Sequence, residues 1–195
     1  MARHSYPQSQ QQSCTAVAIM VTLAELGKIP DTDINKPTEM KIWGLTKRSA
    51  IQGKEEIMPH SAILYLTSEG MKTELHQNKM ITSGLKQAAA DDYKEYKAGL
   101  KSAQITRSGA LDVTTAFKDD ARVFLIVGFY ESQALKTHTV LLRKDNGKIW
   151  AMNPDGGTDT EYSEAEVLNF ISGQTNPVNF ANRPYLSAGI AYRVW

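Results

Sequence analysis

The single cysteine of the chain, Cys14, lies at the start of an apolar segment with helical spacing, Cys14–Gly27. Ser13 is a residue type that favours the N-cap position, and Gly27 is a common C-terminal stop. Cys14 is therefore expected in the first helical turn, where the partial positive charge of the helix end favours thiolate over thiol. The thiolate is the form that attacks carbonyl carbons. The alternative is a small buried thiol that packs like any apolar side chain.

Three further residues are of the types that a thiol nucleophile needs. Gln8, six positions before Cys14, could bring a side-chain amide to an oxyanion. His138 opens an apolar strand, and Asn153 ends the strand expected to pair with it. Because neighbouring strands lie about 4.8 Å apart, His138 and Asn153 can meet if they share a face. His138 would then take the proton of Cys14, and the Asn153 amide oxygen would orient the imidazole ring.

This order of Gln, Cys, His and Asn resembles the papain-like cysteine peptidases, and most resembles their bacterial C39-like and AvrRpt2-like (C70) groups. Those groups share a Gln-x5-Cys opening, a His that starts a strand, a short turn, and an Asp or Asn followed directly by Pro. The corresponding residues here are Gln8, Cys14, His138 and Asn153, the last followed by Pro154. The resemblance implies a papain-like fold and says little about residues 30–120.

Two of these assignments have competitors nearby in the sequence. Asp155 alternates to the same face of an extended strand as Asn153 and could orient the histidine instead. Asn153 is preferred, because Pro154 interrupts the strand and the resembling families use the residue before the proline. Residues 10–12 are also glutamines, and Gln8 is preferred because the six-residue offset matches the resembling families.

The other histidines fit surface or capping positions better than catalytic ones. His4, His60 and His76 form no His-x3-His pair, and a single cysteine excludes both an internal disulfide and a cysteine-rich zinc site. We therefore expect no metal and no cofactor. Trp150, on the strand that carries Asn153, is a candidate for the wall of a substrate groove.

Length and composition limit the remaining classes. The 195 residues are 42% hydrophobic and predict one domain over 1–195. A net charge of +1 gives no electrostatic reason to expect nucleic acid as a partner. The sequence shows no apolar signal-peptide core, and its longest apolar run is too short to span a bilayer. We expect a protein that is cytoplasmic as synthesised. Export by a specialised secretion system that needs no cleavable signal peptide is left open.

The pattern of elements predicts an α+β fold, with residues 30–120 mostly helical and 121–195 mostly β-sheet. Helices are expected over residues 14–27, 55–70, 83–101 and 163–173, with a short helix or loop over 37–44. Strands are expected over residues 71–76, 121–130, 136–143, 148–153 and 188–195. Asn146-Gly147 is a strong turn signal between two of these strands, because both residues accept a positive φ.

The sequence thus predicts a cysteine hydrolase, most simply a peptidase of bacterial effector or toxin type that acts on a protein or peptide. Two alternatives remain open. The same thiol site could serve a glutamine deamidase, transglutaminase or acyltransferase, or Cys14 could be a core residue of a non-catalytic binding module. The sequence does not determine the oligomeric state.

Overall fold

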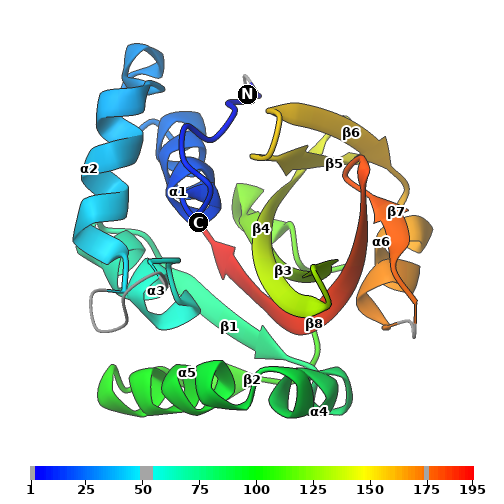
Figure 1. Cartoon of the computed structure of the whole chain (residues 1–195). Helices are drawn as coiled ribbons and strands as arrows, with labels where there is room; N and C mark the ends of the chain where they lie inside the picture. The colour runs from blue at the N-terminus through cyan, green and yellow to red at the C-terminus, as the bar shows by residue number, and fades with distance from the viewer. Residues whose placement is uncertain (1–2, 49–54, 174–175) are drawn as a thin grey trace.

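A computed structural model describes residues 3–48, 55–173 and 176–195. It is an α+β structure in which a largely antiparallel sheet is flanked by helices, so the expected class is confirmed (Figure 1). The α-helices are α1 (Cys14–Glu25), α2 (Lys36–Thr46), α3 (Pro59–Ser68), α4 (Lys79–Ala88), α5 (Ala90–Ser102) and α6 (Glu164–Ile171). Short 3-10 turns η1 (Asp31–Asp33) and η2 (Lys118–Asp120) lie in the connections.

The strands follow the order β2-β1-β8-β3-β4-β5-β6 across the sheet, and β7 pairs with β8 at one end. Their bounds are β1 (Thr73–Gln77), β2 (Arg107–Ser108), β3 (Arg122–Glu131), β4 (Ala134–Asp145), β5 (Lys148–Asn153), β6 (Thr158–Tyr162), β7 (Val178–Phe180) and β8 (Arg183–Val194). The sheet curls strongly, and β6 approaches the β7–β8 turn, where Asn182 Nδ2 donates to Thr160 Oγ1 at 2.9 Å (Figure 1).

Two apolar clusters lie on opposite faces of this curled sheet. One packs α1, α2 and α3 against side chains such as Phe124, Leu141 and Met152. The other fills the inside of the curl, with Val140, Leu142 and residues of α6. Alternation along β4 and β5 thus assigns each side chain to one face.

Helix α1 lies between the sheet and α2, and every one of its residues is buried, including Thr22 and Glu25. The apolar spacing in the sequence suggested that one face of this helix is buried. In the structure, small residues such as Ala16 and Ala18 let neighbouring elements pack on every side of the helix. The helix end that carries Cys14 is thereby fixed against β4.

Most expected elements are present, with two clear differences. The helix expected over residues 83–101 is two helices, broken at Ala89, whose backbone (φ −140°, ψ 61°) is not helical. Strands β2, β6 and β7 were not expected; the longest of them, β6, has a polar sequence, and its place in the sheet depends on pairing with β5. The turn between β4 and β5 is as predicted, with positive φ at Asn146 and Gly147.

Within the described ranges, no helix is both long and apolar enough to cross a bilayer.

Candidate active site

Cys14 and His138 come together although 124 positions separate them. Cys14 is the first residue of α1, His138 lies on β4, and each is 7% exposed. Burial raises the pKa of the Cys14 thiol, but the charge of His138 and a hydrogen bond to it outweigh burial, so the net pKa is lowered. Burial lowers the pKa of His138, whereas the charge and hydrogen bond of Cys14 raise it, and the net pKa is raised. Both shifts favour a thiolate–imidazolium pair.

Asn153 holds the far side of the imidazole. Its Oδ1 lies 2.8 Å from His138 Nε2, and the side chain is buried. Its Nδ2 donates to the Ala181 carbonyl at 2.9 Å, which fixes the amide orientation and turns Oδ1 toward the ring. The ring nitrogen that remains, Nδ1, is the one available to the thiol. The three residues thus have the arrangement of a nucleophile, a base and an orienting group.

The threonines that follow the pair in sequence join the two elements. Thr15 Oγ1 and Thr139 Oγ1 are 2.6 Å apart and buried, and they connect the first turn of α1 to β4. The backbone N–H of Thr139 also donates to the Cys14 sulfur and helps to lower its pKa. Contacts of Thr15 and Thr139 therefore help to set the position of Cys14 relative to His138.

Tyr185 packs against one face of the imidazole ring of His138. Its ring stacks on His138 with centroids 5.6 Å apart and planes 12° from parallel. Burial raises the pKa of Tyr185 to about 12, so the phenol stays neutral beside the pair. Sequence reasoning did not identify Tyr185, because the residue lies far along the chain on β8 and belongs to no motif.

A cleft with a volume of about 670 Å³ opens beside His138. The N-terminal segment, the end of β3 and the starts of β4 and β8 form its walls. Its lining residues are Gln8, Ser9, Gln10, Gln11, Phe129, Tyr130, Glu131, Thr137, His138, Asp155, Pro177, Arg183, Pro184 and Tyr185. The cleft offers space for a substrate segment next to the candidate pair.

Gln8 lies on this cleft, where its backbone N–H donates to the Pro154 carbonyl at 2.7 Å. This bond ties the segment before Cys14 to the residue that follows Asn153. Gln8 Nε2 faces the Gln11 carbonyl at 3.3 Å, a long contact that an incoming oxygen could replace. The Cys14 backbone N–H is the first of α1 and has no intrahelical acceptor. The two donors are of the kind that an oxyanion needs.

Asp155 is near the site but in a different role from Asn153. Its carboxylate pairs with Arg183 at 2.7 Å, and its backbone N–H donates to Asn153 Oδ1 at 3.0 Å. It acts on His138 through its charge, which helps to raise the histidine pKa. The atom that accepts from His138 Nε2 is Asn153 Oδ1, whereas the Asp155 carboxylate pairs with Arg183.

Trp150 does not line the cleft, contrary to expectation. It lies three positions before Asn153 on β5 and therefore points to the opposite face of the strand. There the guanidinium of Arg3 stacks over its ring at 3.6 Å.

A residue outside every motif, Glu39 on α2, holds the loop that leads to Cys14. Its buried carboxylate accepts from the Ser9 backbone N–H at 2.8 Å and from Ser13 Oγ at 2.5 Å. Ser13 is the N-cap residue, but its hydroxyl donates to Glu39 and does not cap the helix N–H groups. Nothing local in the sequence distinguishes Glu39 from a solvated helix glutamate.

The other histidines lie away from the pair. His4 pairs with Asp31, His76 lies on β1, and the ring of His60 packs against Gly99 on α5. Among the residues that the structure describes, no group of three or more His, Cys, Asp or Glu side chains is arranged to hold a metal ion.

Comparison of the sequence with protein-family models finds no match, and comparison with curated proteins finds none either. A functional assignment therefore depends on the geometry of the site and on the motif resemblance.

Proposed function

We propose that the protein is a papain-like cysteine hydrolase that cleaves peptide bonds. The observation that carries the proposal is the contact chain Cys14–His138–Asn153, with the thiol pKa lowered and the imidazole pKa raised. The order and spacing of Gln8, Cys14, His138 and Asn153 add the motif resemblance.

The proposed reaction is acyl transfer through the thiol. The Cys14 thiolate attacks the substrate carbonyl carbon, and the oxyanion receives hydrogen bonds from the Cys14 backbone N–H and the Gln8 side chain. Protonated His138 gives its proton to the leaving amine as the carbon–nitrogen bond breaks. Water then attacks the thioester with His138 as base, and the carboxylic acid product leaves Cys14 free. Asn153 keeps the imidazole ring oriented throughout.

Mass spectrometry of a protein mixture incubated with the enzyme tests this reaction class. Wild-type enzyme should generate new peptide termini, while Cys14→Ala and His138→Ala should generate none. A mass gain of about 1 Da at glutamine side chains, without new termini, would instead show a deamidase that uses the same acyl-enzyme. If wild type and Cys14→Ala give identical spectra, Cys14 is a structural thiol and the proposal is wrong.

A further inference from the structure

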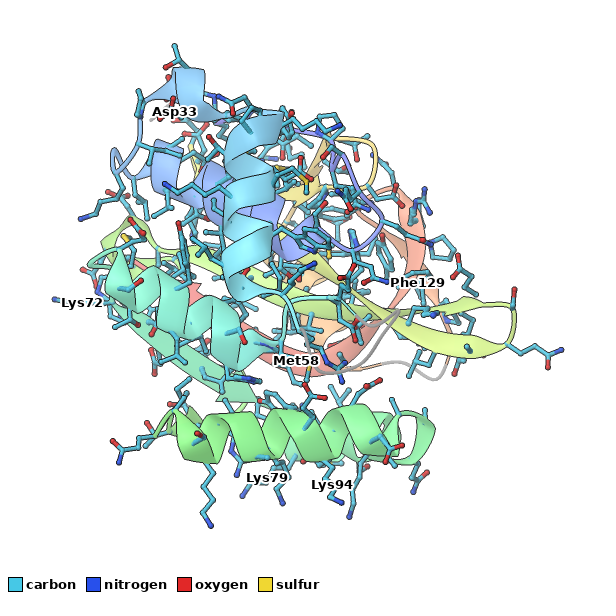
Figure 2. All side chains as sticks on the ribbon, turned by 60° about the vertical axis from the view of Figure 1, so that its left-hand side comes forward. Asp33, Met58, Lys72, Lys79, Lys94 and Phe129 are labelled. Atoms are coloured by element: carbon cyan, nitrogen blue, oxygen red, sulfur yellow. The ribbon has the colours of Figure 1, made fainter. Side chains whose placement is uncertain are left out.

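The end of strand β3 is an open sheet edge that forms part of the cleft wall. β3 pairs with β4 as far as Glu131↔Ala134, but its pairing with β8 stops at Gly128↔Leu186. The first residues of β8, Arg183–Tyr185, pair with β7 instead. Among the residues that the structure describes, Phe129, Tyr130 and Glu131 therefore have a strand neighbour on one side only, and all three line the cleft beside His138. Figure 2 shows Phe129 where the β3–β4 hairpin leaves the body of the molecule.

An open edge of this kind presents backbone N–H and C=O groups that can pair with another strand. Three residues of strand span about 10 Å, which is enough to pair with a short extended peptide. The same cleft is lined by His138 and Gln8, which border the candidate nucleophile.

The charges along this edge favour one kind of peptide. Asp155 is neutralised by Arg183 at 2.7 Å. Glu131 is exposed at the end of β3 and has no ion pair among the described residues. Phe129 and Tyr130 beside it offer aromatic surface, on which the stem or the charge of a basic side chain can pack.

We propose that the cleft takes an extended basic segment of a protein, which adds as a strand to the β3 edge at residues 129–131 and places a lysine or arginine near Glu131. This inference rests on the proposed function, because it takes the scissile bond to be a main-chain peptide bond. A glutamine side chain on a folded surface would not pair with the edge in this way.

The test measures binding separately from cleavage. The Cys14→Ala variant is titrated with a library of twelve-residue peptides that differ in charge, and wild type is assayed on the same peptides. Basic peptides should bind best. Glu131→Lys should weaken their binding by about fivefold, because it removes one partly exposed ion pair and adds repulsion. Glu69→Lys makes the same charge change at the end of α3, away from the cleft, and should leave binding unchanged.

Backbone pairing has its own readout. N-methylation along the best peptide should weaken binding by about fivefold at alternate positions, since every second N–H of a strand faces the edge. Uniform tolerance of N-methylation, or equal binding of acidic and basic peptides, overturns the inference. If basic peptides bind in this pattern but wild type cuts none of them, the inference stands and the peptidase proposal fails. If wild type cuts peptides without regard to charge or N-methylation, the peptidase proposal stands and the inference fails.

Discussion

Thr15 and Thr139 show how the site is built at the scale of single residues. Each follows one member of the candidate pair, and the bond between their hydroxyls fixes α1 against β4 without using the reactive atoms. Glu39 does the same for the approach to Cys14, by accepting from Ser9 and Ser13. The geometry of the candidate site is thus supported by neighbouring residues outside the Cys14–His138 pair.

Glu39→Ala should therefore lower turnover at least tenfold, because Ser9 and Ser13 lose their shared acceptor and the segment from Gln8 to Cys14 loses its anchor. Glu39→Gln keeps an oxygen that can accept both bonds and should recover most of the activity. The measurement is kcat and KM for both variants, with urea unfolding to check that each is folded. Equal activity of wild type and a folded Glu39→Ala variant would contradict the positioning role.

At the scale of elements, the turn after β5 docks the N-terminal segment onto the site. Gly157 has a φ of +64°, and a Cβ placed there would lie 2.8 Å from the backbone nitrogen of Pro7. Pro7 precedes Gln8, whose N–H bonds to the Pro154 carbonyl. The absence of a side chain at position 157 lets the segment that carries Gln8 approach the strand end that carries Asn153.

Gly157→Ala should reduce activity by more than its cost in stability suggests. The left-handed backbone costs about 1 to 2 kcal/mol for a residue with a Cβ, and the clash with Pro7 displaces Gln8 in addition. Steady-state kinetics and urea unfolding separate the two effects. Gly147→Ala, at a positive-φ turn position with nothing near its added Cβ, is the matched control and should lose stability without a comparable loss of kcat. A similar kcat for the two variants would be evidence against the docking role.

Elements whose signals are local could be predicted from the sequence. The Asn146-Gly147 turn depends on adjacent residues and forms as expected, and the helix expected from residue 163 begins with a capping box between Ser163 and Glu166. By contrast, β6 and the contact between Pro7 and Gly157 depend on partners far along the chain. The same difference holds within the site. Motif spacing pointed to Cys14, His138 and Asn153, whereas nothing in the sequence indicated Glu39 or Tyr185.

At the scale of the whole molecule, a buried network of charges joins the end of α1 to the sheet and to the N-terminal segment. The Glu25 carboxylate, fully buried, pairs with Arg122 and Arg143, each at 2.6 Å, and also accepts from the His4 backbone N–H. Arg143 in turn bonds the His4 carbonyl and the Asp159 carboxylate. The network therefore holds together the segment that leads to Gln8, the helix of Cys14 and the strand of His138.

Glu25→Gln should lower the free energy of unfolding by about 3 to 5 kcal/mol, because two buried guanidinium groups lose a charged partner. Urea unfolding followed by tryptophan fluorescence measures the change. Glu161→Gln removes an exposed ion pair with Lys148 and should cost less than about 1 kcal/mol. Equal losses for the two variants would show that the buried network contributes no more than a surface pair.

The pH dependence of Cys14 alkylation by iodoacetamide tests the central claim most directly, and the label is unambiguous because the chain has one cysteine. The Cys14 pKa is lowered, so the thiolate forms below the ordinary range near pH 8.5, and the raised pKa of His138 keeps its partner charged above about 6.5. We predict a labelling rate in wild type that reaches its plateau at a lower pH than that of free cysteine, because the Cys14 pKa is lowered. In a folded His138→Ala variant, the rate should still be rising toward pH 8.5. A wild-type profile that matches free cysteine, or one that His138→Ala leaves unchanged, would contradict the thiolate–imidazolium pair.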